Sequence, residues 1–209
     1  MLRPKINAAL SLLKGAFKST PEGENTATAA EPDIACGHQG SVSAAQTVCP
    51  AGNGLERVLI LIDSQNIYYS TRLIFDKRFS YDRFMSKVSA NRHVVNAVVY
   101  VSERNEGPGI FQARLRRMGY EVKEKISNRK TEPGRGLWDI AIAIDAMAHA
   151  KDVDRLILVS GNSDFELLIT TLLRDFGVKT EVHAVPPLTS RGLINVANPF
   201  VPIDDSLLY

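Results

Sequence analysis

The sequence predicts an α/β fold in three layers, with a mainly parallel sheet of about five strands covered by helices on both faces. Several strand-length runs, such as residues 58–62 and 156–159, are apolar without interruption, which is the pattern of strands buried on both faces. Segments with apolar residues at helical spacing lie between these runs. This alternation is typical of parallel strands that are joined by helices.

The composition fits one ordinary domain with an appendage. The chain has 209 residues, of which 44% are hydrophobic and 23% charged, as in soluble globular proteins. No apolar run approaches the ~20 residues of a membrane-spanning helix. The net charge is only +2, but the stretch from Arg114 to Arg135 holds eight basic residues against three acidic ones. Such an excess attracts a phosphate backbone, although a solvated basic surface is the commoner explanation.

Residues 1–18 predict an amphipathic helix that begins near Pro4. Apolar residues recur there at spacings of four, three and four: Ile6, Leu10, Leu13 and Phe17. They would form one apolar stripe on a helix that also carries four cations and no acid. A helix over residues 4–18 would bind a membrane surface or a protein partner, or serve as a targeting peptide. The sequence does not choose among these, but the lack of a nearby small-residue cleavage site argues against a secretory signal.

Residues 19–54 predict a disordered linker, because they are rich in small and polar residues and hold few large apolar ones. Cys36, His38 and Cys49 fall in this segment, but a closed zinc site needs four ligands at tighter spacing. The rest of the chain has no cysteine, which fits a reducing compartment. We therefore expect a cytoplasmic protein, with peripheral membrane or organelle targeting through the N-terminal helix left open.

The folded domain is expected over residues 55–209. Strands are predicted at residues 58–62, 94–101, 120–125, 156–159 and 178–185, and helices at 81–88, 111–118, 137–151, from 165 onward and at 190–197. The strand at 120–125 is the most polar, so we expect it near a sheet edge.

Three acids are expected at one edge of the sheet. Asp63 follows the strand at 58–62, and Asp164 follows the strand at 156–159. Parallel strands bring their carboxyl ends together, so these two side chains could share a cleft. Asp139, in the first turn of the helix at 137–151, is the third candidate.

Each of these features also has an ordinary structural explanation. An acid such as Asp139 is favoured in a first helical turn by the helix dipole, and Ser163 with Glu166 fits a capping box. Asp145 lies six residues after Asp139, about 240° further round the helix, so both cannot point into one site. We favour a hydrogen-bonded role at a helix-packing seam for Asp145.

Three motifs in this order resemble the NYN domain family of the PIN-like nuclease superfamily, which includes the bacterial LabA-like proteins. They are Asp63-x-x-Asn66, a basic loop that leads to Asp139 and Asp145, and Ser-Gly-Asn-Ser-Asp-Phe at residues 160–165. The resemblance covers roughly residues 57–203. It implies a Rossmann-like, PIN-like fold and a metal-dependent ribonuclease.

The resemblance also implies roles for individual residues. Asp63, Asp139 and Asp164 would be the catalytic acids and would hold Mg²⁺ or Mn²⁺, with Asn162 and Asp145 as further candidate ligands. Water activated by the metal would hydrolyse single-stranded or looped RNA. The candidate RNA contacts are Asn66, Tyr68, Arg129, Lys130, Arg135, Ser160 and Ser163.

Two positions depart from the family pattern. Asn162 stands where the family usually has an acid, and the run Arg135-Gly-Leu-Trp-Asp139 is one residue longer than the usual Lys-Gly-Val-Asp. With one carboxylate fewer, the site would bind a second metal ion more weakly. The alternative hypothesis is therefore a catalytically weak or inactive module with an RNA-binding or regulatory role.

A third hypothesis is a phosphatase or nucleotide-binding enzyme on a similar sheet. It has less support, because no glycine-rich phosphate loop follows a strand. A homo-oligomer remains open.

Overall fold

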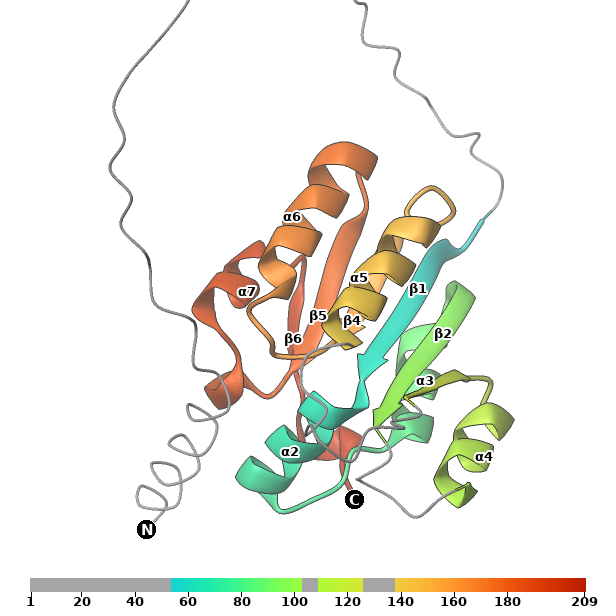
Figure 1. Cartoon of the computed structure of the whole chain (residues 1–209), viewed down its shortest axis with the longest axis vertical. Coiled ribbons are helices and arrows are strands. Elements are labelled where there is room, and N and C mark those ends of the chain that lie inside the picture. The colour runs from blue at the N-terminus through green and yellow to red at the C-terminus, as the bar shows by residue number, and fades with distance from the viewer. Residues whose placement is uncertain (1–53, 103–108, 126–137) are drawn as a thin grey trace, which may run out of the picture. The chain divides into compact units, whose positions relative to one another are not determined.

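The computed structural model describes residues 54–102, 109–125 and 138–209 (Figure 1). The predicted helix over residues 1–18, and the predicted linker apart from Gly54, lie outside the described residues.

The described chain alternates strands with helices. In chain order the elements are β1 (Glu56–Asp63), α2 (Ser64–Phe75), α3 (Tyr81–Ser89), β2 (Arg92–Ser102), α4 (Ile110–Arg117), β3 (Glu121–Lys125), α5 (Trp138–His149), β4 (Arg155–Val159), α6 (Phe165–Phe176), β5 (Lys179–Ala184), the 3₁₀ turn η1 (Pro186–Leu188), α7 (Arg191–Val196), β6 (Phe200–Pro202) and the 3₁₀ turn η2 (Asp205–Leu207).

The six strands form one sheet in the order β3-β2-β1-β4-β5-β6, and every neighbouring pair is parallel. This confirms the predicted α/β class and adds a sixth strand, and it places β3 at an edge as expected. The chain moves outward from β1 to β3 and then returns to β4, on the other side of β1. In such a sheet the carboxyl ends of the two strands at the switch point form the usual ligand site.

Helices cover both faces of the sheet (Figure 1). One face packs against α2, α3, α4 and the end of the chain, through residues such as Ile60, Phe84 and Leu115. The other packs against α5, α6 and α7, through residues such as Leu61, Ile142 and Leu168. The middle strands are therefore buried on both faces, which explains their unbroken apolar sequences.

The helix α2 and the strand β6 were not predicted. The buried side of α2 includes Ser64, Ser70 and Thr71, so its apolar periodicity is weak. The hydroxyl of Ser70 donates to the Asn66 carbonyl at 2.7 Å, and that of Thr71 to the Ile67 carbonyl at 2.9 Å. These bonds let polar side chains enter the core. The strand β6 is only three residues long and contains a proline, which suits an edge.

Charged side chains join the amino-terminal ends of the strands, far from the switch-point edge. Arg92 pairs with Glu56 at 3.2 Å and with Glu181 at 2.8 Å, and Arg155 pairs with Glu56 at 2.7 Å. His183, nearer the carboxyl end of β5, contacts Glu181 at 2.7 Å. The network ties β1, β2, β4 and β5 together.

Among the described residues, no helix has the length and apolar content needed to span a membrane.

Candidate active site

Asp63 ends the central strand β1 and begins α2. Its Oδ1 accepts the backbone N–H of Asn66 at 3.1 Å, which caps the helix, and its Oδ2 accepts the hydroxyl of Ser160 at 3.5 Å. The residue is 7% exposed. The carboxylate is thus fixed between the ends of β1 and β4, at the switch point of the sheet.

The first turn of α2 is tied to the loop after β4. The side-chain carbonyl of Asn66 accepts the backbone N–H of Gly161 at 3.0 Å. A Cβ added at Gly161 would lie 3.1 Å from the Thr189 hydroxyl and 3.2 Å from the Leu188 carbonyl. A glycine therefore lets the loop after β5 approach, and Asn66 has a structural bond in addition to its predicted RNA contact.

Asn162 and Asp164 form a compact turn before α6. The backbone N–H of Asp164 donates to Asn162 Oδ1 at 3.2 Å, and Asn162 Nδ2 donates to Asp164 Oδ2 at 3.5 Å. Asn162 is buried, whereas Asp164 is exposed. The amide of Asn162 thus lies beside the carboxylate of Asp164.

Asp139 lies in the first turn of α5 and interacts electrostatically with both other acids. Burial raises the pKa of Asp139, a hydrogen bond with Asn162 lowers it, and the charge of Asp164 raises it, with a net increase. Burial raises the pKa of Asp63 to about 6, and the charge of Asp139 adds to the effect against the bond from Asn66. Asp139 therefore lies within electrostatic range of Asp63 and of Asp164.

The donors offered by this group suit a hard divalent cation. They are carboxylate oxygens of Asp63, Asp139 and Asp164 and the amide oxygen of Asn162, and a cation would relieve the repulsion between the acids. In the described parts of the chain, however, no three His, Cys, Asp or Glu side chains lie close enough together to enclose a metal ion.

Asp145 has other partners. Its Oδ2 accepts Lys123 Nζ at 2.6 Å and also the hydroxyl of Tyr100. Burial and this hydrogen bond raise the pKa of Tyr100, so its hydroxyl stays a donor. Asp145 thus links α5 to β2 and β3, as a residue at a packing seam would.

The predicted RNA contacts differ in accessibility. Ser160 has no exposed surface, and its hydroxyl bonds Asp63 and the backbone N–H of Asn162. Ser163 is exposed and Tyr68 half-buried, with its ring 5.4 Å from that of Tyr69. The basic residues Arg129, Lys130 and Arg135 lie outside the described residues.

The capping box suggested for Ser163 and Glu166 is not formed. No side chain caps the start of α6. Instead, Glu166 Oε1 accepts the hydroxyl of Ser190 at 2.8 Å, and a Cβ at Gly192 would lie 2.2 Å from the Glu166 carboxylate. Glu166 therefore joins α6 to α7, a role for which its sequence position gave no signal because the partner lies 24 residues away.

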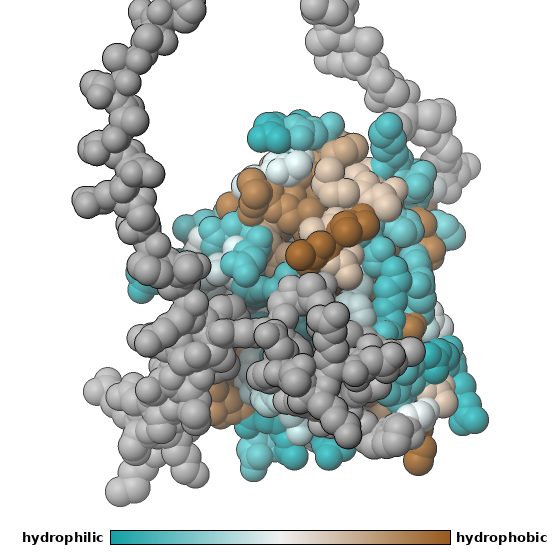
Figure 2. All heavy atoms as spheres, in the orientation of Figure 1, coloured by the Kyte–Doolittle hydropathy of each residue, from teal (hydrophilic) through white to brown (hydrophobic). Residues whose placement is uncertain are grey.

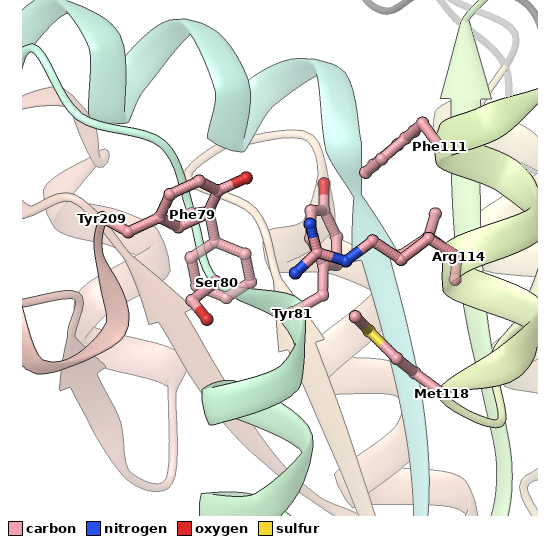
Figure 3. A pocket seen from close by; sticks show the side chains of 8 residues that line it. Phe79, Ser80, Tyr81, Phe111, Arg114, Met118 and Tyr209 are labelled. Atoms are coloured by element: carbon pink, nitrogen blue, oxygen red, sulfur yellow. The ribbon is translucent and has the colours of Figure 1, made fainter.

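A surface pocket lies elsewhere, between the start of α3, the helix α4 and the end of the chain (Figure 3). Its lining residues are Phe79, Ser80, Tyr81, Phe111, Arg114, Leu115, Met118 and Tyr209. None of the candidate site residues lines this pocket.

Comparisons with known proteins agree with the fold. A curated relative, the low amplitude and bright protein LabA of Synechococcus elongatus, is 28% identical over 160 residues, which cover 71% of this chain and 84% of that protein. A crystal structure of a Vibrio parahaemolyticus protein of unknown function has a TM-score of 0.71 and 38% identity, and covers 76% of this chain and 99% of that chain. The family model of the NYN domain matches residues 57–204. With most of its length matched and its acids at the switch point of the sheet, the chain belongs to the NYN domain family, a family of PIN-like nucleases.

Proposed function

We propose that the chain is a metal-dependent endoribonuclease that hydrolyses phosphodiester bonds in single-stranded or looped RNA. The observation that carries this proposal is the buried carboxylate of Asp63 at the carboxyl end of β1, at the switch point of the sheet, where the charge of Asp139 acts on it. Acids in such a setting raise one another's pKa and favour a cation between them. NYN family nucleases use divalent metals, and the NYN domain implies a nucleic-acid substrate.

Asp63, Asp139 and Asp164 would hold Mg²⁺ or Mn²⁺, with Asn162 as a neutral oxygen donor. When bound, the cation supplies a water of lowered pKa and neutralises charge on the scissile phosphate.

The surrounding residues position these acids. The N–H of Asn66 and the hydroxyl of Ser160 fix the two oxygens of Asp63, and both bonds favour its ionised form. The amide of Asn162 donates to Asp164 Oδ2 and so orients that carboxylate. Ser163 and Tyr68, which retain exposed surface, are available to the RNA strand, and Arg129, Lys130 and Arg135 would add phosphate contacts.

A second candidate function is a module that binds RNA without cutting it. The observation that favours it is Asn162, whose amide replaces a carboxylate and already bonds Asp164. With one carboxylate fewer, the site attracts a cation less strongly.

A cleavage assay distinguishes the two functions. The full chain is incubated with structured and unstructured RNA in Mn²⁺, Mg²⁺ or EDTA, beside Asp164→Asn, Asp139→Asn and Asn162→Asp. Asp152→Asn is the matched control, because Asp152 is an exposed acid outside the site.

We expect cleavage that requires metal, that falls at least 100-fold in Asp139→Asn and Asp164→Asn, and that Asp152→Asn retains. A wild-type chain that binds RNA but never cuts it, together with an active Asn162→Asp variant, would establish the binding module instead. Cleavage that survives the loss of Asp63, Asp139 and Asp164 together would exclude the proposed mechanism.

A further inference from the structure

The helix α5 carries two apolar stripes, and the sheet uses only one of them. Ile142, Ala146 and Ala150, on α5 and just after it, are at most 2% exposed and pack into the core. The outer stripe has the spacing i, i+3, i+4, i+7 and i+8 and consists of Ile140, Ala143, Ile144, Met147 and Ala148. Ala143 lies at its edge, is partly buried and also packs against the core. Ile140 is 57% exposed and Ile144 62%. A helix that is apolar on opposite sides is normally covered on both.

The neighbouring helix α6 extends this surface. Leu167 is 74% exposed and Leu173 48%. Figure 2 shows apolar residues gathered on the face over α5 and α6. Of the ten large apolar side chains that are exposed in the described parts of the chain, five lie on these two helices. We call the outer stripe of α5 with Leu167 the α5–α6 face. Leu173 lies six residues after Leu167, about 120° further round α6 and on the side of Glu166 that meets α7, so it does not belong to this face.

The size of the α5–α6 face suits an interface between proteins. Its four large side chains, Ile140, Ile144, Met147 and Leu167, expose on the order of 450 Å², within the range of the largest apolar patch on a typical monomer. A standard interface buries about 800 Å² on each partner, and its centre is poor in charge. The α5–α6 face would supply the apolar centre of such an interface.

We propose that the chain forms a two-fold symmetric homodimer through the α5–α6 face. A two-fold interface needs a surface that complements itself. On α5, the large Ile140, Ile144 and Met147 alternate with the small Ala143 and Ala148. The ridges of one copy can therefore enter the gaps of the other when the two helices cross.

The charges of α5 leave this surface free for apolar contact. Apart from His149, the helix has two ionisable residues, Asp139 and Asp145. Asp139 interacts with the candidate site, and Asp145 pairs with Lys123. The outer stripe thus presents no charge to select a charged partner, and a second copy offers the matching apolar surface.

The test is the mass of the full chain in solution, measured by light scattering after size exclusion from 1 to 100 µM. We expect twice the 23.0 kDa of one chain. Ile144→Glu and, separately, Leu167→Lys should raise the dissociation constant of the dimer at least 100-fold, because each substitution buries a charge in the interface. Ile110→Glu is the matched control: Ile110 is 84% exposed on α4, away from this face, and its variant should remain dimeric. Circular dichroism on all variants confirms that each one folds.

Three results would overturn the proposal. The wild type could remain a monomer at 100 µM, or both α5–α6 variants could remain dimers while folded. A third variant, Leu10→Glu, tests the apolar stripe predicted over residues 4–18. If it alone separates the copies, the N-terminal segments make the dimer and the α5–α6 face does not.

Discussion

Asp63 has a carboxylate that is buried at the end of the central strand, where the charge of Asp139 repels it. Its pKa rises from 3.8 to about 6, so the folded state disfavours the ionised form. The ionised carboxylate therefore destabilises the folded state: this effect is absent below pH 3.8 and complete above about pH 6.

We expect the free energy of unfolding of Asp63→Asn, measured in EDTA at pH 7.5, to exceed that of the wild type by up to about 3 kcal/mol. Asparagine keeps the helix cap, while cleavage should be lost. Urea denaturation measures the difference, which should shrink as the pH falls toward 4. A variant less stable than the wild type would mean that the carboxylate serves the fold.

Glu181 shows the opposite effect. Burial alone would raise its pKa, but hydrogen bonds from His183 and Arg92 outweigh burial and lower the pKa from 4.5 to about 2. Since the folded pKa is depressed, this acid stabilises the protein above pH 4.5 and the stabilisation is lost as the pH falls through about 2.

We therefore expect Glu181→Gln to lower the free energy of unfolding at pH 7 by about 3 kcal/mol, and to flatten the dependence of stability on pH between 4.5 and 2. Denaturant titrations across this range measure both effects. Asp205→Asn is the control, because Asp205 pairs with Lys77 at the surface and should contribute less than about 1 kcal/mol. Equal losses in the two variants would contradict the role given to Glu181.

The side chains at the carboxyl edge could be predicted only in part. The positions of Asp63 and Asp164 follow from the alternation of strands and helices, because parallel strands end at one edge. The contact between Asn66 and Gly161 joins residues 95 positions apart and depends on packing that no local pattern encodes. For the same reason, nothing in the sequence indicated that Ser160 is buried against Asp63.

The two acids of α5 have different roles. Asp139 faces the candidate site, while Asp145 binds Lys123 and Tyr100 on the sheet side. Their separation of six residues predicted this divergence from helical geometry alone.

We expect Asp145→Asn to lower the free energy of unfolding by about 1–2 kcal/mol, since Lys123 loses its ionic partner in a half-buried setting. Its cleavage activity per folded molecule should stay within about threefold of wild type. Asp139→Asn should be inactive and at least as stable as wild type, because burial raises the pKa of Asp139 and the fold disfavours its ionised form. Thermal denaturation and the RNA assay, run on both variants, measure the contrast. An inactive but stable Asp145→Asn would assign this acid to the metal site instead.

Elements with apolar repeats were predictable, and elements stabilised in other ways were not. The helix α5 and the strand β4 have strong patterns and lie close to where the sequence placed them. The helix α2 buries hydroxyl groups that bond its own backbone, so its apolar signal is diluted. Short β6 depends on its neighbour β5 for its hydrogen bonds.

At the scale of the whole molecule, the sheet order places β1 between β2 and β4. The fold class follows from unbroken apolar strands, but those strands do not specify their neighbours, because each is buried on both faces and could occupy any central place. The strand order, which creates the switch point, could therefore not be predicted from the sequence and is seen only in the structure.

The long separation between β1 and β4 also has a consequence for how the chain is made. Arg57 in β1 meets Asp154 just before β4, although the two residues are 97 positions apart in the chain. A chain emerging from the ribosome exposes one edge of its central strand, and one face of its first three strands, until β4 and α5 have been synthesised. Such an edge pairs readily with other strands, and distant pairing slows folding.

We expect a fragment of residues 1–153, which ends before β4, to give no cooperative unfolding transition by circular dichroism and to be digested quickly by proteases. The full chain should resist digestion within the described strands and helices. A stable, cooperatively folded fragment would show that β1, β2 and β3 form an independent unit. If the fragment does not fold, the nascent chain needs protection until most of its length has left the ribosome.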